Sequence, residues 1–177
     1  DDTLTLGYSL RQEWITFRGG EFIEEEVRKL NEQANFDLPS GSRRLFHDIV
    51  FKYRNLRYKG VQVDGHQADI RLAPAIQGLL SDEHLLQTFW RLKSFFILPG
   101  DLNFASRLEL RTNSTDADTD ILRIGGLEQV RGYRDPEFVG SNRILTNFEL
   151  RNNSIRAFSF VFQPAIFFDS GWLFGSI

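Results

Sequence analysis

The chain has 177 residues, a length that suits one domain, and its net charge of -3 argues against a nucleic-acid binder that works by bulk positive charge. Mean hydropathy is -0.30, and no apolar run approaches the ~18–20 residues of a transmembrane helix, which argues against a helical membrane protein. These numbers are compatible with a transmembrane β-barrel, because the strands of such a barrel alternate apolar and polar residues and their mean hydropathy is ordinary.

The sequence lacks the residue patterns of common metal and catalytic sites. It contains no cysteine, which removes disulfides, thiolate chemistry and cysteine–zinc sites. The three histidines, His47, His66 and His84, are scattered and show no metal-ligand spacing. Serines such as Ser94 lack the flanking glycines of a nucleophile elbow. We therefore expect no metal, no cofactor and no enzymatic activity.

The strongest signal along the chain is an alternation of apolar and polar residues with a period of two. It begins at residues 3–14, where Leu4, Leu6 and Tyr8 share one parity and Ser9 and Arg11 the other. Such alternation is typical of a strand with one apolar and one polar face. The same pattern predicts strands at 48–58, 68–74, 102–111, 144–151 and 157–169.

Residues 85–98 fit two periods. Leu85, Phe89, Leu92 and Phe96 have helical spacing, and Ser81-Asp82-Glu83 before them resembles a helix cap. A strand would instead place a different apolar set on one face, namely Leu86, Trp90, Leu92, Phe96 and Leu98. We predict a strand because every clear neighbour is one.

These segments predict an all-β protein of about seven antiparallel strands, many of them roughly 9–14 residues long, which exceeds the usual ~5–6 of soluble sheets. Their polar faces carry charges of both signs, which fits a hydrated interior, because charge on a lipid face costs about 2–4 kcal/mol at the midplane. The pattern thus favours part of a transmembrane β-barrel. A soluble sandwich would show the same alternation and remains the alternative.

The links between the predicted strands alternate in length. Segment 17–42 is long, 60–67 short, 77–84 intermediate, 99–101 tight, 112–143 very long and 152–156 short. Outer-membrane barrels place short turns on the periplasmic side and long loops outside. Within the first long link, Ile23, Val27 and Leu30 have helical spacing and predict a short surface helix over 21–31.

The longest link, 112–143, changes character along its length. Residues 113–120 are polar and acidic, whereas the later part contains glycines that permit unusual backbone conformations, at Gly125, Gly126 and Gly132. Pro136 and Gly140 shape the return to the next strand. Loops longer than about 12–15 residues are usually functional or disordered, so this second part is the candidate functional segment.

The stretch GGLEQVRGYRDPEFVGSNRILTNFELR resembles the signature of the BamA-type outer-membrane barrel superfamily. That superfamily includes two-partner secretion transporters and the barrels of outer-membrane patatin-like proteins. Its hallmark is a VRGF/Y motif in an extracellular loop that folds back into the barrel lumen. An F-x-D-x-G segment follows it. The matching positions here are Gly125, Gly126, Val130, Arg131, Gly132, Tyr133, Glu149, Phe167, Asp169 and Gly171.

An arginine carried into a barrel interior must be paired or hydrated. By parity, Asp169 and Glu149 project from the polar faces of their strands, and a guanidinium can bind a carboxylate with two parallel hydrogen bonds. We therefore expect Arg131 to dock on Asp169, with Glu149 as the alternative partner. Such a pair either holds the loop in place or takes a direct part in transport.

The resemblance implies about sixteen strands in the complete barrel, of which residues 1–177 would supply the seventh to the thirteenth. The chain begins at Asp1-Asp2 and contains no methionine, so we expect a processed or truncated piece of a longer protein. Segment 112–143 would be the re-entrant extracellular loop.

The implied function is insertion of outer-membrane proteins or export of polypeptides. The implied partners are unfolded outer-membrane or secreted polypeptides, the lipid bilayer, periplasmic POTRA modules of the same chain and accessory lipoproteins. The implied location is the outer membrane of a Gram-negative bacterium, with that of a mitochondrion or plastid as an alternative. A membrane anchor for a patatin-like phospholipase and a soluble all-β binding domain are the rival functions.

Overall fold

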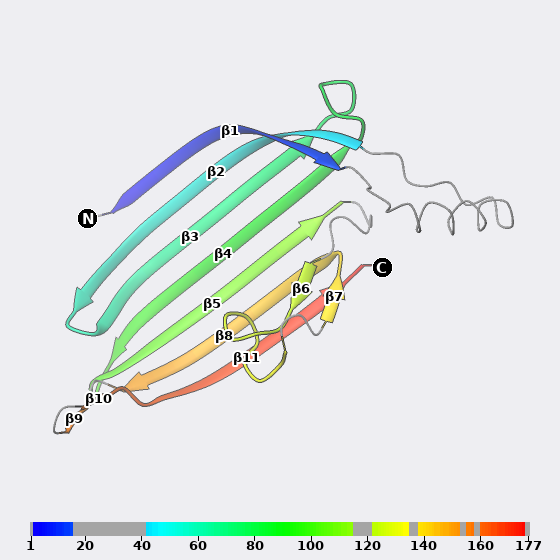
Figure 1. Ribbon diagram of the computed structural model, residues 1–177. Coiled ribbons are helices and arrows are strands. Elements are labelled where there is room, and N and C mark those ends of the chain that lie inside the picture. The colour runs from blue at the N-terminus through cyan, green and yellow to red at the C-terminus, as the bar shows by residue number, and fades with distance from the viewer. Residues whose placement is uncertain are drawn as a thin grey trace, which may run out of the picture.

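The computed structural model describes residues 2–15, 42–114, 122–134, 138–152, 155–157 and 160–175. These residues form one antiparallel sheet of seven strands in the order β1-β2-β3-β4-β5-β8-β11, together with two short hairpins (Figure 1). The strands of the sheet are β1 Thr3–Ile15, β2 Ser42–Lys59, β3 Gln62–Ala75, β4 Leu85–Leu98, β5 Leu102–Asn113, β8 Asn142–Asn152 and β11 Ala165–Phe174. The sheet is open, with β1 and β11 at its edges.

The all-β prediction and the count of seven strands in the main sheet are confirmed. The ambiguous segment 85–98 is strand β4, and β2 and β3 are longer than the pattern indicated. None of the described residues belongs to a helix long and apolar enough to cross a membrane. The helix predicted over 21–31 lies outside the described residues.

The prediction of a single strand over 157–169 is wrong. Strand β9 Ile155–Ala157 ends where this segment begins and pairs with β10 Phe160–Phe162, and β11 begins only at Ala165. Pro164 has no N–H for a strand ladder, and its carbonyl oxygen instead accepts a hydrogen bond from the Asn152 backbone N at 3.0 Å. The predicted short link 152–156 is wrong for the same reason, since residues 153–164 separate β8 from β11.

The strand register keeps apolar side chains together on one face, here called the apolar face. Leu6 lies opposite Phe51 on the neighbouring strand, and Tyr8 opposite Ile49. This face is exposed from one edge of the sheet to the other: Leu6 on β1 and Ile166 on β11 are each 77% exposed. No second layer of the described residues covers it, as a soluble sandwich would require.

A row of aromatic rings crosses the apolar face. Phe96 of β4, Phe104 of β5, Phe148 of β8 and Phe168 of β11 stack in sequence, with ring centroids 6.4, 6.2 and 6.5 Å apart. Because each ring comes from the next strand of the sheet, the four form one continuous band.

The opposite face, here called the polar face, carries charged side chains and a small apolar cluster. Asp48 accepts hydrogen bonds from Arg71 at 2.7 Å and from Arg11 at 3.3 Å. Phe46 is fully buried and packs with Ala73, Ala75 and Leu85, which explains why an apolar residue has the parity of the charged ones.

The links fall at two ends of the sheet (Figure 1). The β2–β3 turn, the β4–β5 turn and the β9–β10 hairpin share one end, and the link 76–84 and the C-terminal end of β5 lie at the other. At the turn end, the buried Asn103 side chain bonds the backbone N and O of Val63 at 3.1 and 2.7 Å. This contact ties the β2–β3 turn to β5.

Candidate functional site

Residues 125–134, which follow β6 Leu122–Ile124 and precede β7 Phe138–Gly140, lie against β8 and β11 (Figure 1). The two short strands pair and close its base, a hairpin that the sequence pattern did not predict. Within the loop, Gly126 N donates to Tyr133 O at 3.1 Å. Gly126 and Gly132 have φ of 81° and 98°, a region that favours glycine, as expected for these positions.

Arg131 docks on the polar face through the contact that the sequence predicted. Its Nε donates to Oδ2 of Asp169 at 2.7 Å and its Nη2 to Oδ1 at 2.8 Å, so the pair is bidentate. The backbone N of Arg131 also donates to Asp169 Oδ2, at 3.1 Å. One carboxylate therefore fixes both the side chain and the main chain at the loop tip.

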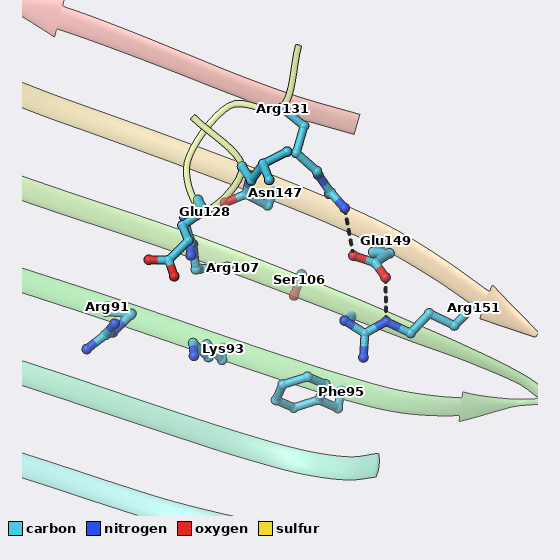
Figure 2. Close-up of a pocket in the computed structure, with 12 residues that line it drawn as sticks. Arg91, Lys93, Phe95, Ser106, Arg107, Glu128, Arg131, Asn147, Glu149 and Arg151 are labelled. Atoms are coloured by element: carbon cyan, nitrogen blue, oxygen red, sulfur yellow. Dashed lines mark hydrogen bonds and ion pairs between the residues drawn. The ribbon is translucent and has the colours of Figure 1, made fainter. Parts of the chain in front are cut away.

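Glu149 binds Arg131 at the same time, rather than in place of Asp169. Its Oε2 accepts from Arg131 Nη1 at 3.2 Å, and its Oε1 accepts from Arg151 Nε at 2.5 Å (Figure 2). The Phe167 ring centroid lies 3.6 Å from Arg131 Cζ, which adds a cation–π contact. The hydrogen bond with Asp169 raises the pKa of Arg131 above its usual value, so this loop residue stays charged.

Asn147 connects Asp169 to the backbone of the loop, and sequence reasoning missed it. Its Nδ2 donates to Asp169 Oδ1 and to the carbonyl oxygen of Gln129, each at 2.7 Å. Asn147 lies directly opposite Asp169 on β8. Its parity placed it on the polar face, but the contact with Gln129 depends on the path of the loop.

Arg143 forms a second anchor that the sequence did not reveal. Its Nη1 donates to the carbonyl oxygen of Arg123 at 2.7 Å and to Gln129 Oε1 at 3.2 Å. Its Nη2 donates to Glu109 Oε1 at 2.5 Å, and both charged side chains are buried. The Arg143–Glu109 pair thus connects the base of the loop to β8 and β5.

Gly171 of the F-x-D-x-G segment makes room for apolar loop residues. Val130 and Ile124 of the loop are buried against Leu145 of β8. A Cβ atom at Gly171 would lie 3.0 Å from Ile124 Cδ1 and 3.1 Å from both Leu145 Cδ2 and Val130 Cγ2. These contacts are tighter than van der Waals packing allows without movement.

Replacing Gly171 with alanine should lower the free energy of unfolding by about 1–3 kcal/mol and loosen the loop, because the added methyl group overpacks this cluster. Gly7 on the opposite edge strand is the matched control, since its Cβ would meet only Val50 Cβ at 3.9 Å. Denaturant unfolding of both variants in detergent checks this expectation. Equal stability of the two variants would contradict it.

The remaining predicted residues lie at the rim of the site. Tyr133 is half-exposed and contacts Phe138 edge-to-face, with ring centroids 5.5 Å apart. Gly125 also has a positive φ, of 147°. Pro136 lies outside the described residues. Within the described ranges, no group of three or more metal-ligating side chains could hold an ion.

Comparisons of the chain with protein-family models, curated proteins and solved structures return no significant match. The proposals that follow rest on the residues and their geometry.

Proposed function

We propose that this chain is part of the wall of a BamA-type transmembrane β-barrel in an outer membrane. The barrel inserts outer-membrane proteins or exports polypeptides. The observation that carries the proposal is the docked Arg131. A loop motif is held on the polar face of the sheet by Asp169, while the opposite face of the same sheet is apolar and exposed.

The apolar face supports a position in a bilayer. Contiguous apolar surfaces of this extent mark sites of contact with a protein or a membrane, because water solvates such surfaces poorly. The band of Phe96, Phe104, Phe148 and Phe168 resembles the aromatic girdles that flank the hydrocarbon zone of outer-membrane barrels.

The polar face supports a water-filled interior rather than a catalytic site. Both carboxylates at the docked loop are occupied: Asp169 by Arg131 and Asn147, and Glu149 by Arg131 and Arg151. A general acid or base needs a free oxygen within reach of a substrate proton. We therefore assign this cluster a loop-holding role in a protein that handles polypeptides without covalent chemistry.

A photo-crosslinking amino acid at neighbouring positions tests this function. Phe95 lines a pocket on the polar face, and Phe96 lies on the apolar face. In proteoliposomes supplied with an unfolded outer-membrane protein, a crosslinker at position 95 should capture that polypeptide. The same crosslinker at position 96 should capture lipid. Polypeptide capture at neither position, or equally at both, would contradict the proposal.

A further inference from the structure

A pocket of about 440 Å³ opens on the polar face beside the docked loop (Figure 2). Its floor comes from β4, β5 and β8, and Leu127 and Glu128 of the loop form one side. The lining is rich in positive charge, and its cations are Arg91, Lys93, Arg107, Arg131 and Arg151.

Two of these cations face each other across neighbouring strands. Lys93 of β4 and Arg107 of β5 are direct cross-strand partners. Directly opposed residues of one face have Cβ atoms about 4.5–5.5 Å apart, and like charges at this spacing destabilise a sheet. Arg91 lies two residues from Lys93 on the same face and adds to the positive potential.

The carboxylates near this pair bind other residues. Asp69 pairs with Arg91 at 3.4 Å, Glu109 with Arg143 at 2.5 Å, and Glu149 with Arg131 and Arg151. Glu128 lines the pocket, and its carbonyl oxygen accepts a hydrogen bond from Arg107 Nη2 at 2.7 Å.

Among the described residues, neither Lys93 nor Arg107 therefore forms an ion pair with a carboxylate, and Asp69 and Glu109 act on the Lys93 ammonium only from a distance. Among the described residues, Lys93 has neither a hydrogen bond nor an ion pair, and Figure 2 draws no interaction to it. The Nε of Arg107 is buried without a hydrogen-bond partner in the same part of the chain. Two cations side by side, neither of them in an ion pair within the described part of the chain, are an arrangement that a dianion satisfies.

We infer that this pocket binds an oxyanion with two negative charges, and that a phosphate or diphosphate group is the chemistry that fits. The guanidinium of Arg107 presents a fork to two oxygens, and the ammonium of Lys93 supplies a point charge. One dianion can contact both cations at their cross-strand spacing, whereas each carboxylate of an acidic peptide brings a single charge. Phe95 and Leu127 provide an apolar margin for the group that carries the phosphate.

Binding of inorganic pyrophosphate to the whole chain in neutral detergent micelles tests this site by titration calorimetry at low ionic strength. Pyrophosphate should bind, and Lys93→Gln should weaken the affinity about tenfold, the loss expected for a charge-assisted contact. Lys52→Gln is the matched control, because Lys52 lies outside the pocket and its cross-strand partner on β3 is Asp69. Its affinity should equal that of the unaltered chain.

Thermal unfolding separates loss of the site from loss of the fold. Pyrophosphate should raise the unfolding temperature of the unaltered chain and of Lys52→Gln, but not that of Lys93→Gln. Without ligand, Lys93→Gln should unfold at the same or a higher temperature than the unaltered chain, because the substitution removes a like-charge pair.

A parallel titration with lysophosphatidic acid distinguishes a lipid headgroup from a free phosphate compound, and binding of either probe through Lys93 supports the site. The inference is overturned if neither probe binds, if Lys93→Gln binds as the unaltered chain does, or if hexaglutamate binds as tightly as pyrophosphate. The site does not depend on the polypeptide-handling role, since the titration uses no membrane and no client polypeptide.

Discussion

Replacing Arg131 with alanine should release the loop from the polar face and lower the free energy of unfolding by about 3 kcal/mol. Removal of one partner of a buried ion pair costs about 3–5 kcal/mol, because the other charge is left uncompensated. The Asp169 side chain is only 2% exposed, which makes this a buried pair. The lower value of the range is expected because the Arg131 side chain is 26% exposed. Asp169 would keep Asn147 as its side-chain donor.

Limited proteolysis measures the release directly. Bonds within residues 122–134 should resist proteinase K in the unaltered protein and be cleaved rapidly in Arg131→Ala. Arg131→Lys should give intermediate protection, because an ammonium keeps the charge but cannot form the bidentate pair. Unaltered protection of the loop in Arg131→Ala would show that the ion pair does not hold it.

An exposed pair on the same sheet is the control for this prediction. Arg57 and Asp64 form an ion pair at 2.5 Å near the β2–β3 turn, with the Arg57 side chain 75% exposed. Arg57→Ala should cost no more than about 1 kcal/mol, the upper range for surface ion pairs. The contrast between the two arginines isolates the effect of burial from that of pair formation.

Replacing Glu109 with alanine should destabilise the sheet by about 3–5 kcal/mol. Glu109 and Arg143 are 4% and 5% exposed, so the substitution leaves a guanidinium buried without a carboxylate. Arg111, whose Nε lies 3.3 Å from Glu109 Oε1, loses the same partner. Chemical unfolding followed by circular dichroism in detergent gives this cost.

The loop should respond to Arg143 more than to Glu109. Arg143 donates to Arg123 O and Gln129 Oε1, whereas Glu109 reaches the described residues of the loop through Arg143. Arg143→Leu should therefore expose residues 122–134 to proteinase K, and Glu109→Ala should leave them protected at temperatures below unfolding. A Glu109→Ala protein as stable as Arg57→Ala would contradict the account of this pair.

The period-two pattern predicted most of the sheet because side chains of one face recur at every second residue along a strand. Leu4, Leu6, Tyr8, Leu10 and Trp14, which share one parity, set the face of β1. The pattern failed where apolar parity continued through a break: Phe162 and Ile166 share one parity, yet Pro164 between them ends the ladder. It also missed the start of β2, where Phe46 has the parity of charged residues.

The docking partner of Arg131 was predictable, because the parity of Asp169 and the family resemblance of the segment around it were enough to identify it. The contacts of Asn147 and Arg143 with Gln129 were not, because they depend on where the loop lies over the sheet. The role of Gly171 was equally hidden. It depends on side chains from three segments that are distant in sequence.

Site-directed spin labelling of β4 in lipid bilayers tests the central claim, that one face of the sheet meets hydrocarbon and the other meets water. The sequence has no cysteine, so each single cysteine introduced along 86–96 carries a unique label. Labels at Leu86, Trp90 and Leu92 should be accessible to oxygen, and those at Gln87 and Arg91 to a water-soluble nickel chelate. Equal nickel accessibility on both parities, or immobilised labels packed against protein at Leu86, Trp90 and Leu92, would contradict it.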